Sequence, residues 1–190
     1  MRPLLILVGL AATLLLWNPA LAAEDTLGVP SLAKAARLDD LFAQLKAAPN
    51  EQDAIEIEQK IWVEWTTPED PKLANLMDQA LAARRVADYD KALSILDQMT
   101  SEWSGYPEGW NQRATVHFLK GELEKSLADI AETLTREPRH FGSLAGRGMI
   151  RLQQAKPALA VQSILAAMEY HPYLRERGLV KALMDKAPLR

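Results

Sequence analysis

The clearest copy of a repeating pattern in this chain is residues 107–140, PEGWNQRATVHFLKGELEKSLADIAETLTREPRH. A large apolar residue, Trp110, is followed by a small one, Ala114, on a predicted helix. Gly121 separates that helix from a second apolar run, and Pro138 closes the segment. Glycine readily takes the left-handed conformation that ends a helix, so we expect two helices joined by a turn at Gly121.

The same pattern recurs without gaps at a spacing of 34 residues. The equivalent positions are Leu76, Trp110 and Leu144; Ala80, Ala114 and Gly148; Ala92, Ser126 and Ala160; and Leu96, Ile130 and Ile164. Two helices approach closely only where side chains are small, so the second and third sets predict the crossing points of three hairpins. One hairpin cannot bury its apolar side alone, and the copies are therefore expected to stack.

This pattern resembles the tetratricopeptide repeat (TPR), a helix-turn-helix unit of 34 residues. The first copy is weaker than the others, because Ser104 stands where a proline would close it. The resemblance implies an all-α fold, a right-handed α-solenoid with helical caps at both ends. Its three TPR hairpins are expected at 73–106, 107–140 and 141–172.

Helical patterns flank the three copies on both sides. Residues 31–66 predict an N-terminal hairpin that lacks the small-residue signature, which we interpret as an atypical fourth hairpin acting as a cap. Residues 173–190 predict the C-terminal capping helix that such arrays need to present a polar end.

The first 22 residues have the layout of a secretory signal peptide. An apolar run from Pro3 to Trp17 follows Arg2, and Ala20-Leu21-Ala22 has the small-x-small pattern of a cleavage site. We expect a cut after Ala22 and a short flexible segment over 23–30. The alternative is an uncleaved anchor, but the apolar run is shorter than the ~20 residues that a membrane-spanning helix needs.

Composition restricts the class of protein. The chain of 190 residues has a formal net charge of −3, 48% hydrophobic residues and no cysteine. These values disfavour a disordered chain and a dedicated nucleic-acid binder, and the missing thiols exclude disulfides and thiol catalysis. Together with the signal, they predict a protein exported to the periplasm of a Gram-negative bacterium, with no membrane contact after cleavage.

No catalytic or cofactor motif is present, so we expect no enzyme and no cofactor. His117, His140 and His171 lack the spacing of a paired-histidine metal motif, and no metal site is assigned. A metal-handling or enzymatic accessory role for His140 and His171 is kept as the less favoured alternative. We expect Arg113 to play a structural role, with Asp129 as its partner.

The TPR resemblance implies a concave groove, lined by the first helix of each hairpin, that takes an extended peptide or a partner helix. Carried onto this chain, the groove residues are Met77, Leu81, Arg84, Asn111, Thr115, Phe118, Ala145, Met149 and Leu152. Asn111 is the candidate for clamping a peptide backbone. One TPR subtype clamps acidic tails through lysine, asparagine and arginine, but Met77 and Leu81 occupy its first clamp positions, so we do not expect that mode.

Trp103 and Tyr106, in the loop between the first two copies, form a second candidate contact if they are exposed. The function predicted from these features is a periplasmic interaction scaffold or adaptor for a protein or peptide partner, in cell-envelope processes. The alternatives are a self-associating structural module, whose oligomeric state the sequence leaves open, and a groove filled by the chain's own cap or tail.

Overall fold

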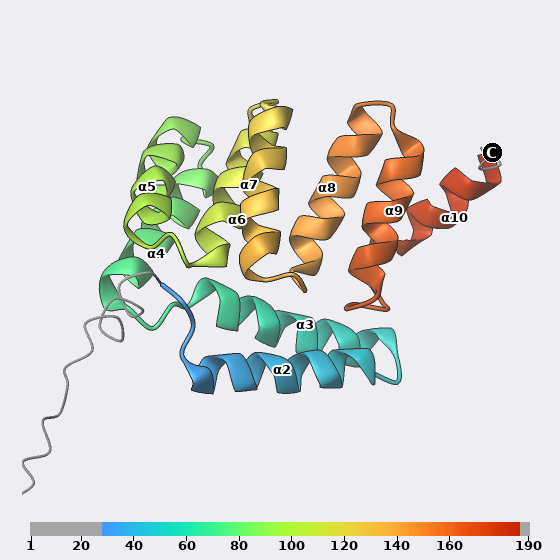
Figure 1. Ribbon diagram of the computed structural model, residues 1–190, viewed down its shortest axis with the longest axis horizontal. Coiled ribbons are helices and arrows are strands. Elements are labelled where there is room, and N and C mark those ends of the chain that lie inside the picture. Colours follow the sequence, from blue (N-terminus) through green and yellow to red (C-terminus); the bar gives the residue numbers. More distant parts are fainter. Residues whose placement is uncertain (1–27, 187–190) are drawn as a thin grey trace, which may run out of the picture.

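The computed structural model of the protein describes residues 28–186, and all regular secondary structure in that range is helical. The nine helices of this range are α2 (Leu32–Lys46), α3 (Glu51–Thr66), α4 (Pro71–Arg85), α5 (Tyr89–Glu102), α6 (Pro107–Leu119), α7 (Leu123–Arg136), α8 (Phe141–Gln153), α9 (Pro157–Met168) and α10 (Arg177–Lys186). The pairs α4–α5, α6–α7 and α8–α9 form three hairpins that stand side by side (Figure 1). The expected all-α solenoid of helical hairpins is confirmed.

Two expectations fall elsewhere in the chain. The signal peptide at 1–22, with its cut after Ala22, lies outside the described residues, as does most of the 23–30 segment. Within the described range, no helix has both the length and the apolar character needed to cross a membrane.

Small residues bring the two helices of a hairpin together, as the repeat predicts. Ser126 Oγ on α7 donates a hydrogen bond of 2.7 Å to the carbonyl oxygen of Ala114 on α6. In the next hairpin, a Cβ added at Gly148 would lie 2.8 Å from Ile164 Cγ1 and 3.2 Å from the carbonyl oxygen of Ala160. A larger side chain at Gly148 would therefore push α9 away from α8.

The turn inside each hairpin takes a left-handed residue at the same repeat position. Gly121 has a φ of 77°, and the equivalent residues Ala87 and Ala155 have φ values of 58° and 55°. In each turn the next amide donates back into the first helix, as from Glu122 to His117 O. Backbone geometry is thus retained in all three hairpins although only the second has the glycine that suits it.

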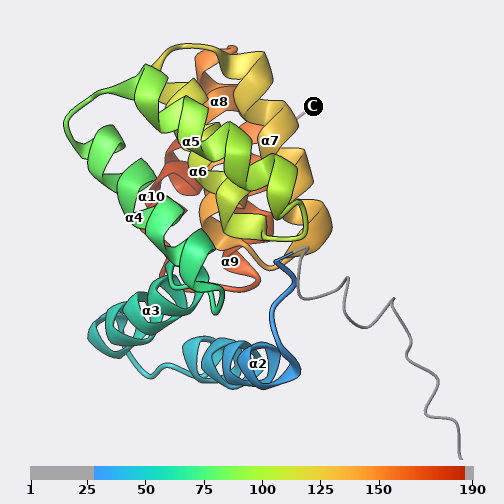
Figure 2. The same ribbon diagram turned by 90° about the vertical axis from the view of Figure 1, so that its left-hand side faces the viewer.

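The N-terminal hairpin α2–α3 does not stack on the first repeat. It lies across one edge of the array, beneath the helices of the hairpins (Figures 1 and 2). Its buried residues, among them Phe42 and Trp65, share a core cluster with Phe141 of α8 and Ile164 of α9. The placement differs from an end cap because the aromatic side chains of α2 and α3 are buried against the third repeat.

Polar contacts join the same surfaces. Asp39 on α2 accepts from Arg139, just before α8, at 2.6 Å. Glu51 on α3 accepts from Arg177 of α10 at 2.9 Å. The start of α10 therefore contacts the N-terminal hairpin, and α10 also packs on α9 through residues that include the buried Val180.

Candidate functional site

A pocket of about 460 Å³ lies where α3, α4, α6 and α8 meet. Its lining residues come from the first helices of the three hairpins and from α3, which runs below α4 in Figure 2. Four of the nine residues expected in the groove come together here: Leu81, Arg84, Asn111 and Thr115. The remaining lining residues are Trp62, Thr66, Gln112 and Gly142.

The aromatic wall of the pocket is Trp62, held in place from both sides. Its Nε1 donates to Glu58 Oε1 at 3.1 Å, and its carbonyl oxygen accepts from Thr66 Oγ1 at 2.7 Å. A Cβ at Gly142 would lie 2.7 Å from the ring, so the glycine is what lets α8 approach Trp62. The pKa of Glu58 lies below its usual value, mainly because His171 forms a hydrogen bond with this carboxylate.

Behind the pocket lies a fully buried carboxylate, Glu108 at the start of α6. It accepts from the side-chain amides of Asn111 and Gln112 through Oε1, and it pairs with His140 Nε2 at 2.9 Å through Oε2. His140 Nδ1 accepts the backbone N–H of Ser143. The proton of a neutral His140 therefore resides on Nε2 and is donated to Glu108.

Two polar groups at the pocket have no partner among the described residues. Gln112 gives its amide N–H to Glu108, which fixes the orientation of the amide and leaves the buried Oε1 without a donor. Arg84 is half-buried, and its side chain forms no hydrogen bond and no ion pair with any residue of the described range. Buried polar groups without partners are uncommon in folded proteins, and such groups are candidates for ligand contacts.

Comparison with known proteins places the chain in a family. A curated TPR repeat-containing protein from Rhizobium etli is 34% identical over 158 residues, which cover 81% of this chain and 78% of the relative. The chain belongs to the TPR repeat-containing proteins. No family model matches it.

Two solved structures have the same TPR-type fold. The crystal structure of MamA matches with a TM-score of 0.50 and 19% identity, covering 70% of this chain and 77% of that one. The P58(IPK) TPR domain matches with a TM-score of 0.54 and 19% identity over 80% of this chain and 45% of that domain. At this level of identity the likeness concerns the fold alone.

Two of the expected TPR groove residues are buried away from this pocket, and a third lines it but has internal partners. Met77 is fully buried in the core of the first hairpin, and Ala145 is buried in the cluster beneath the N-terminal hairpin. Asn111 lines the pocket, but its Nδ2 donates to Glu108 and its Oδ1 accepts from Ser143 Oγ at 2.7 Å. Internal partners thus engage one N–H and the oxygen of this amide, and the expected peptide clamp at Asn111 stays a prediction. Phe118, Met149 and Leu152 do not line this pocket.

The repeat register does not place Trp62, Thr66, Gln112 or Gly142 in the groove. Trp62 and Thr66 reach it because α3 crosses the edge of the array, which no local pattern reveals. Gln112 has no signal of its own, since its unsatisfied oxygen results from the buried carboxylate of Glu108 beside it.

The loop aromatics Trp103 and Tyr106 are buried, so the expectation that they form an exposed contact is wrong. Trp103 Nε1 donates to Asp70 at 3.3 Å, and the Tyr106 hydroxyl donates to the carbonyl oxygen of Trp65. Gly28, with a φ of 71°, packs closely over both side chains. A Cβ at Gly28 would lie only 2.9 Å from Tyr106 Cβ and 3.0 Å from Trp103 Cβ, so only glycine allows this approach.

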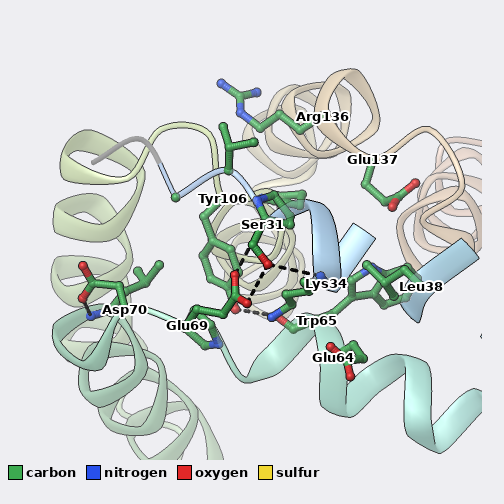
Figure 3. A pocket seen from close by; sticks show the side chains of 16 residues that line it. Ser31, Lys34, Leu38, Glu64, Trp65, Glu69, Asp70, Tyr106, Arg136 and Glu137 are labelled. Atoms are coloured by element: carbon green, nitrogen blue, oxygen red, sulfur yellow. Dashed lines mark hydrogen bonds between the residues drawn. The ribbon is translucent and has the colours of Figure 1, made fainter. Parts of the chain in front are cut away.

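The same segment borders a second pocket, of about 270 Å³, shown in Figure 3. Ser31 donates through its backbone N and its Oγ to the carboxylate of Glu69, and Lys34 Nζ donates to the carbonyl oxygen of Thr67 at 2.7 Å. Burial lowers the pKa of Lys34 from its usual value. These polar groups hold the start of α2 against the α3–α4 turn, so they already have internal partners.

Each histidine has its own glutamate. His117 Nδ1 lies 2.6 Å from Glu122, His140 pairs with Glu108, and His171 Nε2 lies 3.1 Å from Glu58. In the part of the chain that is described, no group of three or more potential ligands could hold a metal ion.

Proposed function

We propose that this TPR protein is an interaction scaffold that binds a segment of a partner protein in the pocket between α3, α4, α6 and α8. The observation that carries the proposal is the grouping of the unsatisfied Gln112 Oε1 and the half-exposed cation of Arg84 with the apolar surfaces of Trp62 and Leu81. A peptide N–H can donate to Gln112, and a carbonyl or carboxylate can accept from Arg84. Neither group then remains without a partner.

The proposed setting is the periplasm of a Gram-negative bacterium, in a cell-envelope process. The support is the apolar run from Pro3 to Trp17, the Ala20-Leu21-Ala22 pattern that follows it, and the absence of cysteine from the sequence. Intact-mass analysis of protein recovered from the periplasmic fraction tests the cut, with a chain beginning at Ala23 as the expected result. A chain that keeps Met1 in the membrane fraction would show an uncleaved anchor.

The proposed role requires no chemistry from the protein itself. Its relative is named a TPR repeat-containing protein, and the buried His140–Glu108 pair is enclosed by packing rather than open to a substrate. That the protein is not an enzyme stays a prediction.

Site-specific photocrosslinking in the native bacterium tests the groove. With a photoreactive amino acid at Thr115, which lines the pocket, we expect a discrete adduct with a partner protein. Arg84→Glu should abolish the adduct, because it reverses the charge at the pocket. Arg85→Glu is the matched control, since Arg85 is exposed one residue further and does not line the pocket. An adduct that survives Arg84→Glu unchanged would refute binding in this pocket.

A further inference from the structure

The second and third repeats share an arginine but differ in its partners. Arg113 on α6 forms a two-pronged ion pair with Asp129 on α7, through Nε at 2.9 Å and Nη2 at 2.7 Å. Its Nη1 also donates to Asp97 on α5 at 2.9 Å. This guanidinium is therefore satisfied by two carboxylates of its own chain, as expected for a structural arginine.

Arg147 occupies the same position 34 residues later, but both carboxylates have been replaced. Ser163 stands where Asp129 does, and Ala131 stands where Asp97 does. The hydrogen bond that remains is from Arg147 Nε to Ser163 Oγ, at 3.2 Å. A serine side chain is shorter than aspartate and uncharged, so it restores neither the second prong nor the charge.

The substitutions extend to the neighbouring turn. His117, which lies 2.6 Å from Glu122 and 3.8 Å from Asp129, is replaced by Arg151, and Glu122 is replaced by Lys156. Arg113 is thus accompanied by three carboxylates, Asp97 of the first repeat and Glu122 and Asp129 of the second. The equivalent positions around Arg147 hold Ala131, Lys156 and Ser163, and Arg151 takes the place of His117. The local charge is inverted while the backbone frame is kept.

The two arginines border a pocket of about 310 Å³ between α8 and α9. Its lining is Arg147, Arg151, Leu159, Gln162, Ser163 and Ala166, which includes no acidic residue. Arg151 donates to Gln154 Oε1 at 2.7 Å, and Gln154 donates in turn to Glu124, so an amide separates this guanidinium from that carboxylate.

The surroundings of Arg147 favour an anion. The pKa of Arg147 is lower than its usual value. Burial is the larger cause, and the charge of the neighbouring Arg151 is the second. The guanidinium stays charged in spite of this, because its pKa begins far above neutrality. A half-buried cation beside a second cation is unfavourable without a counter-ion, and an incoming anion would relieve that repulsion.

We propose that this pocket binds the carboxylate of an aspartate or glutamate side chain from a partner protein, in the place that Asp129 occupies one repeat earlier. The preceding repeat shows that the frame accepts a planar carboxylate in two-pronged contact with this arginine. Leu159 and Ala166 beside the arginines suit a side chain with a short apolar stem. The site shares no residue with the groove pocket and does not depend on the proposed groove function.

The test uses fluorescein-labelled, acetylated hexaglutamate amide as the probe, with anisotropy at fixed ionic strength. We expect Arg147→Gln to weaken binding by about tenfold, as for loss of one charge-assisted contact. Ser163→Asp should weaken it comparably, because it restores the internal carboxylate of the second repeat while keeping both arginines. Circular dichroism should show unchanged helicity in both variants.

Two controls separate this pocket from general charge effects. Arg175→Gln removes a cation whose side chain is 95% exposed, and Arg85→Gln removes an exposed cation that lines neither this pocket nor the groove pocket. Both should leave the affinity within about twofold, a small effect on this scale. Equal weakening by Arg175→Gln or Arg85→Gln would overturn the proposal, as would tight binding to the Ser163→Asp variant or no binding to the wild-type protein. Inorganic phosphate that displaces the probe at lower concentration than succinate would overturn the carboxylate assignment.

Discussion

The indole ring of Trp65 lies flat on the imidazole of His140, with ring centroids 3.9 Å apart and planes 8° from parallel. Trp65 belongs to α3, and His140 is the residue that caps α8. The same imidazole pairs with Glu108 of α6. The imidazole therefore links α3 both to the start of α8 and to α6, the helices with which α3 forms the groove pocket.

Removal of the Trp65 side chain should destabilise the protein strongly. Trp65→Ala should lower the free energy of unfolding by about 3–5 kcal/mol, because it leaves a cavity and removes the stack on His140. Urea denaturation followed by circular dichroism measures the change. Val63→Ala, on the exposed side of the same helix, should stay within about 0.5 kcal/mol of wild type. A loss of less than about 1 kcal/mol for Trp65→Ala would contradict this packing, because it would be close to the effect of an ordinary surface substitution.

The carboxylate of Glu108 should be essential to the buried polar cluster. Glu108→Ala leaves the donors of Asn111, Gln112 and His140 without an acceptor, so we expect a loss of about 3 kcal/mol or more. The measurement is the shift of the urea midpoint at constant slope. Exposed Glu132, whose partner Arg136 is on the same helix, provides the matched Glu→Ala control, with an expected loss of about 0.5 kcal/mol. Similar losses for the two variants would refute the role of Glu108.

Acid should weaken the attachment of α3 to the end of α9. Folding lowers the pKa of Glu58, chiefly through the hydrogen bond with His171. The folded state thus binds this proton less readily than the unfolded state, and the stabilisation is complete above the usual carboxyl pKa of 4.5. It is lost as the pH falls through the lower pKa of the folded state.

Carbon-detected NMR titration of the Glu58 carboxyl tests this expectation directly. We expect its midpoint below 4.5, and a midpoint above 4.5 would contradict the prediction. Glu58→Gln should show a smaller decrease in stability over the same acidic range, because it removes the group that titrates.

Glycine should stabilise the two hairpin turns that lack it. Ala87 and Ala155 hold left-handed backbone at the position where the second repeat has Gly121. Ala87→Gly and Ala155→Gly should each raise the free energy of unfolding by about 0.5–1 kcal/mol, because they relieve that strain. Thermal unfolding measures both. Gly121→Ala should change stability in the opposite direction, and destabilisation by the glycine variants would show that their left-handed turns carry little strain.

Much of the fold follows from local sequence. Ala114, Ser126 and Gly148 recur at one spacing, and small residues at a helix crossing have the same consequence wherever the chain goes next. The partner of Arg113 was also predictable, since Asp129 lies on the facing helix of the same hairpin. These features depend on contacts within one repeat or between successive ones.

The groove was predicted only in part, for a physical reason visible in particular residues. Leu81, Arg84 and Thr115 line it as the repeat register implies. Asn111 lies at the expected place, but Glu108 and Ser143 engage its amide. Hydrogen-bond partners of a buried group depend on everything that surrounds it, and sequence spacing does not provide that information.

The 34-residue spacing was therefore sufficient to establish the helical hairpins, their order and their turns, because short-range sterics and amphipathic periodicity govern them. The course of α2 and α3 across the third repeat, the covering of Trp103 and Tyr106 by Gly28, and the unsatisfied oxygen of Gln112 emerged from the folded chain. Each arises from contacts between residues far apart in sequence. Such contacts are selected by the fit of whole surfaces, which no local pattern encodes.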